Sequence, residues 1–75
     1  MASDLSIMRQ IQKDVVTADK PYGFGKVQCD LAIHKKWLDE WLKNPQHDCL
    51  RARGDIRWNL ACRLQMAVDS FLNPF

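Results

Sequence analysis

Two cysteines and two histidines lie close together in the stretch CDLAIHKKWLDEWLKNPQHDC, residues 29 to 49. Thiolate and imidazole are the ligands that structural zinc prefers, so Cys29, His34, His47 and Cys49 raise the question of a metal site. Their spacings, C-x4-H and H-x-C, match none of the common zinc signatures. On one helix Cys29 and His34 would also lie about 140° apart, although a helix that begins at Asp30 would leave Cys29 in the preceding loop. We therefore expect no metal or other cofactor, with the cysteines as small buried apolar groups.

The two histidines also bear on catalysis, because a nucleophile needs a positioned base and that base needs a group that orients it. His34 falls within an apolar helical face, where we expect a neutral, hydrogen-bonded core histidine, and His47 falls in a short turn. Neither pairs with a cysteine or serine on sequence grounds. The 9 acidic residues are scattered, which provides no carboxylate pair for acid–base chemistry. The sequence therefore predicts that the protein is not an enzyme.

Length and composition indicate a single small globular domain, residues 1–75. Apolar residues make up 47% of the chain and charged residues 27%, close to the globular average. No apolar run approaches the roughly 20 residues that span a bilayer, and the segment MASDLSIMRQIQKD is interrupted by charge too often for a secretory signal. The formal net charge of +2 is too small to indicate nucleic acid by itself. We expect a cytoplasmic protein without membrane contact.

Apolar residues recur at helical spacing along nearly the whole chain, which predicts an all-α fold. Three helices are expected, at residues about 4–16, 26–43 and 48–72. A break at Gly54, within the last of them, would give four helices instead. The second and third helices are joined by a short connection, so these longer helices should pack as an antiparallel pair. The amino-terminal helix should pack across them, in a small three-helix bundle or, if Gly54 divides the last helix, a four-helix bundle.

Local signals mark the ends of these helices. Ser3 and Asp55 are suited to cap helices, because their side-chain oxygens accept hydrogen bonds from free backbone N–H groups. Between the first two helices Pro21 removes a backbone donor. Gly23 and Gly25 are expected to supply flexible or left-handed backbone there.

Two of the expected helices are apolar on more than one side. The additional stripes, with members four residues apart, consist of Cys29, Ile33 and Trp37 and of Trp58, Cys62 and Met66. Two apolar faces per helix are hard to bury within one small copy, and tryptophan and methionine are enriched where proteins meet. We therefore predict a partner-binding surface anchored by Trp37 and Trp58 and completed by Ile33 and Met66. The alternative is that the third helix is covered by the first helix, the carboxyl-terminal tail and the loop that carries Tyr22 and Phe24.

A cluster of arginines in the segment RARGDIR offers a charged rim for such a surface. The segment contains Arg51, Arg53 and Arg57. These side chains, together with Lys36, are suited to bind carboxylates of a protein or phosphates of nucleic acid. The alternative is salt bridging with Asp48 or Asp55. The two helices near these arginines invite comparison with a helix-turn-helix, but their turn contains Pro45 and lacks the usual glycine.

The sequence therefore predicts a non-enzymatic helical module that binds another protein. Short chains of this kind often belong to regulators or inhibitors of phage or mobile-element type that act by direct contact. The additional apolar stripes further predict a homodimer with Trp37 or Trp58 near its two-fold axis. The alternative function is nucleic-acid binding, helix-turn-helix-like, through the region of Arg51, Arg53 and Arg57.

Overall fold

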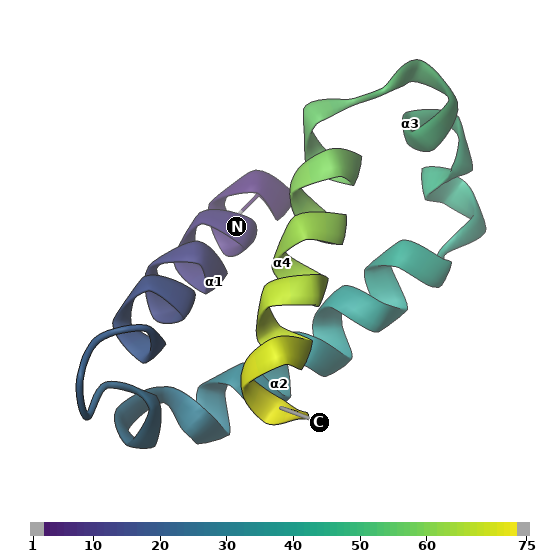
Figure 1. Ribbon diagram of the computed structural model, residues 1–75. Coiled ribbons are helices and arrows are strands. Elements are labelled where there is room, and N and C mark those ends of the chain that lie inside the picture. Colours follow the sequence, from purple (N-terminus) through teal and green to yellow (C-terminus); the bar gives the residue numbers. More distant parts are fainter. Residues whose placement is uncertain (1–2, 74–75) are drawn as a thin grey trace.

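Four α-helices and one short 3₁₀ turn form the protein in the computed structural model, which describes residues 3–73 (Figure 1). The elements are α1 (Asp4–Ala18), α2 (Phe24–Lys43), η1 (Pro45–His47), α3 (Asp48–Arg53) and α4 (Ile56–Leu72). Residues 3–73 contain no strand, which confirms the all-α prediction. The end of the carboxyl-terminal tail, Pro74 and Phe75, lies outside the described residues.

One apolar core lies between the three long helices. Each of α1, α2 and α4 contacts the other two, and Figure 1 shows α1 and α4 side by side with α2 passing behind the end of α4. The buried apolar residues are Met8, Ile11, Ala18, Val27, Leu31, Leu38, Trp41, Leu50, Ala61, Leu64 and Val68. No polar or charged residue in the described part of the chain is buried. Removal of apolar surface from water is therefore the main stabilising contribution.

A left-handed glycine separates the last two helices. Gly54 has φ 67°, a conformation that glycine adopts at little steric cost, and its N–H donates to the carbonyl oxygen of Arg51 at 3.1 Å. Asp55 then caps α4 by accepting from the backbone N–H of Arg57 at 2.8 Å. Of the two predicted alternatives, the break at Gly54 is the one observed. The predicted cap of α1 is also present, since Ser3 Oγ accepts from the N–H of Ser6 at 3.2 Å.

The connection between α1 and α2 is shorter than predicted, because α1 ends two residues later and α2 begins two residues earlier than expected. The left-handed conformation expected of Gly23 or Gly25 is taken by Tyr22, with φ 63°. Gly23 has φ −77° and serves another purpose. A Cβ atom at that position would lie 1.8 Å from the carbonyl oxygen of Thr17. Of the two roles expected of Gly23 and Gly25, flexible or left-handed backbone, the left-handed conformation is found at neither. Gly23 instead provides space for a close backbone approach.

The early start of α2 is explained by an aromatic contact. Phe24, its first residue, stacks on Phe71 of α4 with the ring centroids 6.0 Å apart. Gly25 follows in the first turn of the helix, where a Cβ atom would have no neighbour within 4 Å. Partial burial of the Phe24 ring offsets the low helix propensity of the glycine beside it.

Candidate functional site

The three contacts between the long helices differ in their polar groups, and two hydrogen bonds join α1 to α2. Nε2 of His34 lies 2.7 Å from Oδ2 of Asp14, and the side chains of this pair are 18% and 16% exposed. The indole Nε1–H of Trp41 donates to Oδ2 of Asp4 at 2.8 Å. Displacing one helix along the other would leave these partly buried groups without partners, which is unfavourable. The pairs therefore fix the position of α1 on α2.

Two polar pairs likewise join α2 to α4. The ammonium group of Lys35 forms an ion pair with Asp69, and the amide of Gln65 donates to the carboxylate of Asp39. The hydrogen bond to Asp69 raises the pKa of Lys35. The two pairs lie one helical turn apart on each helix. Both contacts of α2 are therefore bridged by side-chain polar groups.

The α1–α4 contact contains no such pair. No hydrogen bond or ion pair joins these helices within residues 3–73. A groove of about 360 Å³ opens between their amino-terminal halves instead. Its lining residues are Leu5, Arg9, Gln12, Ile56, Asn59, Leu60 and Arg63. We call this feature the α1–α4 groove.

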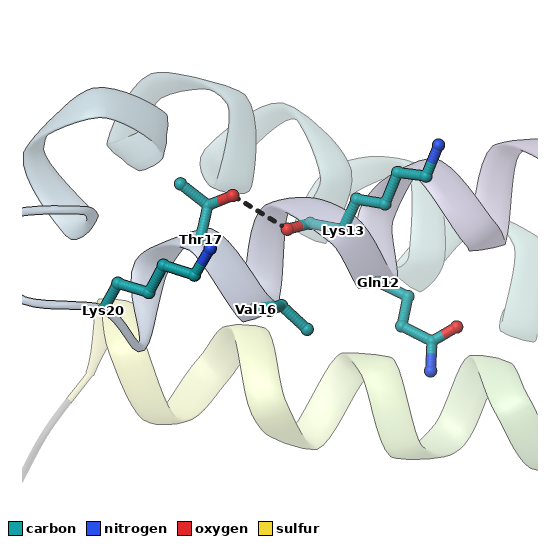
Figure 2. A pocket seen from close by; sticks show the side chains of 5 residues that line it. All are labelled: Gln12, Lys13, Val16, Thr17 and Lys20. Carbon is teal, nitrogen blue, oxygen red and sulfur yellow. Dashed lines mark hydrogen bonds between the residues drawn. The ribbon is translucent and has the colours of Figure 1, made fainter.

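A second hollow of about 410 Å³ continues the surface along α1. It shares Gln12 with the α1–α4 groove and is otherwise lined by Lys13, Val16, Thr17 and Lys20. Figure 2 shows Gln12 and Val16 extending toward α4, whereas Lys13 extends away from it. The hydroxyl of Thr17 donates to the carbonyl oxygen of Lys13 at 3.0 Å. The hydroxyl is thus engaged within α1.

The α1–α4 groove and the second hollow combine apolar side chains with positive charge that has no internal partner. Ile56 is 70% exposed and Val16 is 55% exposed. Arg9 and Arg63 form no ion pair with any of residues 3–73, and no carboxylate from this part of the chain lines either hollow. Guanidinium groups bind carboxylates and phosphates through two parallel hydrogen bonds. The surface is therefore suited to an anionic ligand that also has an apolar face.

The predicted tryptophan anchors lie elsewhere, around Trp41. Trp37 and Trp58 are half-buried, and their ring centroids lie 6.4 and 6.1 Å from that of Trp41. Both pack against the core. Ile33 and Met66 are 66% and 74% exposed. The structure thus brings the tryptophans together at the core and leaves Ile33 and Met66 of their stripes in solvent.

Ile33 and Met66 do not belong to one surface. On α2, Lys35 faces α4 through its ion pair with Asp69. Ile33 lies about 160° around the helix from Lys35 and therefore points away from α4. Met66 is on α4 itself. A partner that contacts both residues would have to bind two different sides of the protein.

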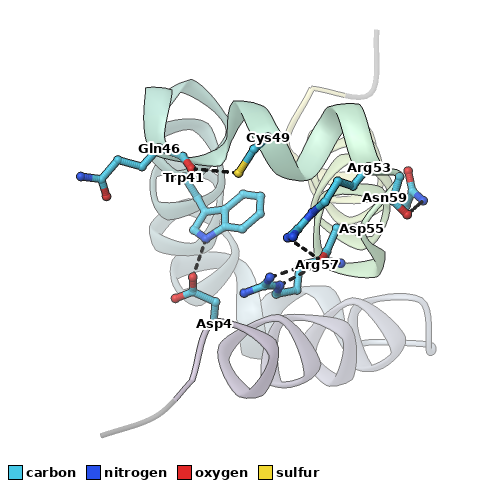
Figure 3. Close-up of polar contacts among 9 residues, drawn as sticks. Asp4, Trp41, Gln46, Cys49, Arg53, Asp55, Arg57 and Asn59 are labelled. Carbon is cyan, nitrogen blue, oxygen red and sulfur yellow. Dashed lines mark hydrogen bonds and ion pairs between the residues drawn. The ribbon is translucent and has the colours of Figure 1, made fainter.

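The predicted charged rim is partly neutralised within the chain. Arg57 donates to both oxygens of Asp55, from Nε at 3.0 Å and from Nη2 at 3.2 Å, and Arg53 lies 3.6 Å from the same carboxylate. Figure 3 shows both guanidinium groups directed at Asp55. The side-chain hydrogen bond from Arg57 lowers the pKa of Asp55 to about 2. Salt bridging, the alternative given for this segment, is thus present at Asp55, while Arg51 and Lys36 are exposed.

The four residues first considered as metal ligands make separate contacts. His34 pairs with Asp14, Nδ1 of His47 lies 2.7 Å from the carbonyl oxygen of Trp41, and Cys29 and Cys49 are exposed. The prediction of buried cysteines is therefore wrong at these two positions, because both lie on helix faces that the core does not cover. Within residues 3–73 no group of three or more potential ligands lies together.

Sequence analysis did not single out the α1–α4 groove, although a signal was present. Leu5, Arg9, Gln12 and Val16 are spaced by four, three and four residues and so share one side of α1. Which side of α4 would face them was not evident. Comparison with protein-family models, curated proteins and solved structures finds no match to this chain. Across residues 3–73, no helix combines the length and the apolar character needed to cross a bilayer.

Proposed function

We propose that the protein is a small helical module that acts by binding another protein rather than by catalysis. The observation that carries the proposal is the contrast among its helix contacts. The contacts α1–α2 and α2–α4 are bridged by polar side chains, whereas the α1–α4 groove combines exposed apolar side chains with Arg9 and Arg63, which form no ion pair within residues 3–73.

The exposed apolar residues explain why binding is favourable. Ile56 and Val16 remain largely in water in the free chain, so covering them with a partner removes apolar surface from solvent. The arginines beside them can pair with a partner's carboxylates at no cost to an internal ion pair. Such a centre of apolar side chains with charged groups at its edge is the usual anatomy of a protein interface.

Several finer predictions from the sequence remain part of this proposal. They are an antiparallel pairing of α2 with α4 beneath α1, a homodimer, a cytoplasmic location and a role as a phage or mobile-element regulator or inhibitor. Ile33 and Met66, the exposed apolar members of the tryptophan stripes, are two further places where we expect a partner to bind. Trp37 and Trp58 would then support these residues from the core.

Site-specific photo-crosslinking in cells tests the proposal. A benzophenone side chain replaces Ile56 in the α1–α4 groove, Ile33 or Met66 on the outer stripes, or Gln28, an exposed polar control on α2. We expect a discrete protein adduct from position 56 and none from position 28. Adducts with nucleic acid alone, removed by nuclease, or no adduct at positions 33, 56 and 66 would contradict the protein-binding function.

Nucleic-acid binding is the alternative, and the arginines of the α1–α4 groove favour it more than the segment at residues 51 to 57 does. In that segment Arg53 and Arg57 share the Asp55 carboxylate, which reduces the charge available to phosphates. If phosphates bind, the affinity should fall steeply with salt as counterions are released. An interface that depends mainly on apolar burial should respond less.

A further inference from the structure

The geometry points to an acidic amphipathic helix of another protein as the ligand of the α1–α4 groove. This inference rests on the proposed function and adds the chemistry of the partner to it. The helix would place an apolar ridge against Leu5, Ile56 and Leu60 and its carboxylates against Arg9 and Arg63.

The charge around the groove is positive. Two guanidinium groups, Arg9 from α1 and Arg63 from α4, line the same groove with two amide side chains, and no carboxylate of residues 3–73 lines it. The amides are Gln12 and Asn59. Two like charges on one surface repel each other, and a carboxylate between or beside them relieves that repulsion. A partner with acidic side chains is therefore favoured over a neutral or basic one.

The apolar character of the groove favours a peptide over nucleic acid. Leu5, Leu60 and the exposed Ile56 line it together with the arginines. A phosphate backbone would satisfy the arginines but leave these apolar groups facing a polar, hydrated ligand. An amphipathic helix satisfies both, because residues three and four apart place its apolar and acidic side chains on adjacent faces.

The groove and the hollow that continues it have the length of a short helix. The α1 lining of the α1–α4 groove, from Leu5 to Gln12, and that of the second hollow, as far as Val16, together extend along about 17 Å of helix axis. This length corresponds to about three turns of a bound helix, enough for three apolar anchors. A helix laid between α1 and α4 would pack its side-chain ridge into the groove between two others, which is the ordinary geometry of helix packing.

The experiment uses the full chain and fluorescent synthetic peptides of about 14 residues, long enough for nearly four helical turns. The acidic peptide carries leucines at i, i+3, i+7 and i+10 with glutamates on both sides of that ridge. One control peptide replaces the glutamates with lysines, and a second replaces the leucines with serines. We expect anisotropy titrations to give an affinity for the acidic peptide at least about tenfold higher than for either control.

Charge reversal then locates the site. In R9E/R63E the acidic peptide should bind at least about tenfold more weakly and the lysine peptide more tightly than in the parent, because the sign of the groove is inverted. The matched control K26E/K43E makes the same change of net charge at exposed positions outside the groove and should retain the parent preference. Circular dichroism checks that each variant is folded. If R9E/R63E is unfolded, R9Q/R63Q, which removes the charge without inverting it, takes its place in the titrations.

Each contrary result overturns the inference in a recognisable way. Absence of acidic-peptide binding at about 100 µM, or equal loss in both reversed variants, removes the α1–α4 groove as its site. Crosslinks to protein from position 33 or 66 would then leave the protein-binding function standing.

A labelled DNA or RNA oligonucleotide that binds the parent but not R9E/R63E, without acidic-peptide binding, overturns the inference. Nuclease-sensitive crosslinks as the sole adducts would overturn the function as well. A groove occupied by a second copy would appear as a dimer in sedimentation that R9E/R63E dissociates.

Discussion

The α2-facing and α1-facing sides of α4 use their polar side chains in opposite ways. Toward α2, Asp69 pairs with Lys35 and Gln65 with Asp39. Toward α1, Arg63 borders the α1–α4 groove without an ion partner in residues 3–73. Groups that are paired within the chain stabilise the fold, whereas a charge without a partner is free to contribute to binding. The comparison separates the side of α4 that stabilises the protein from the side that we propose binds a partner.

Two arginines of α4 show the same difference. Arg57 donates twice to Asp55 and is therefore committed to the cap of its own helix. Arg63, six residues later on the same helix, has no such partner within residues 3–73. Residue type alone does not distinguish the two, but the position of the nearest carboxylate does.

The largest expected effect on the free energy of unfolding is at the turn that joins α1 to α2. Gly23→Ala should lower the free energy of unfolding by about 3 kcal/mol, because the added Cβ meets the backbone carbonyl of Thr17 and cannot be accommodated by a side-chain movement. Chemical denaturation measures the change. The matched control is Gly25→Ala, where the added methyl group has no neighbour within 4 Å and helix propensity predicts a small gain. Equal effects of the two substitutions would show that the close approach at Gly23 is not rigid.

An intermediate effect is expected where a polar pair joins α1 to α2. Asp14→Ala should destabilise the protein by about 1 to 2 kcal/mol, since it leaves the partly buried His34 without its partner. In a double-mutant cycle with His34→Ala, we expect a coupling energy of about 1 kcal/mol. Additive effects of the two substitutions would mean that the hydrogen bond does not fix α1 on α2.

A smaller effect on thermal stability is expected from the pairing of Arg57 with Asp55, a pairing that Arg63 does not have within residues 3–73. The pKa of Asp55 is about 2, below its ordinary value of 3.8, so its ionised form stabilises the folded state. That contribution is complete above the ordinary pKa and is lost as the pH falls through about 2. Asp55→Asn should therefore lower Tm by a few degrees near neutral pH, and the difference from the parent should shrink between pH 4 and 2. A difference that does not vary with pH would contradict the Asp55–Arg57 assignment.

The helices could be predicted because their signals are local. The break at Gly54 and the caps at Ser3 and Asp55 depend on residues within a few positions of one another. The connection around Gly23 was mispredicted because the contact that requires a glycine is with Thr17, at the end of the preceding helix. The sequence correctly predicted a turn, but a glycine is required there because of a contact in space and not because of its backbone dihedral angles.

The candidate site was harder to predict than the fold for the same reason. The arginines at residues 51 to 57 are conspicuous in the sequence, yet two of them share one carboxylate. Arg9 and Arg63 are 54 residues apart in the chain, and the sequence does not indicate that they line one groove. Only the placement of α1 beside α4 brings them together. Helical periodicity shows which residues share a face but not which faces of separate helices meet.

If the arginines of the α1–α4 groove are free for a partner, they should not stabilise the fold. Thermal and denaturant unfolding of Arg9→Gln/Arg63→Gln measures whether they do. We predict a free energy of unfolding within about 0.5 kcal/mol of the parent, as for surface substitutions without internal partners. A loss above about 1 kcal/mol, comparable to that of Asp14→Ala, would show that these arginines hold α1 against α4 and would contradict the account.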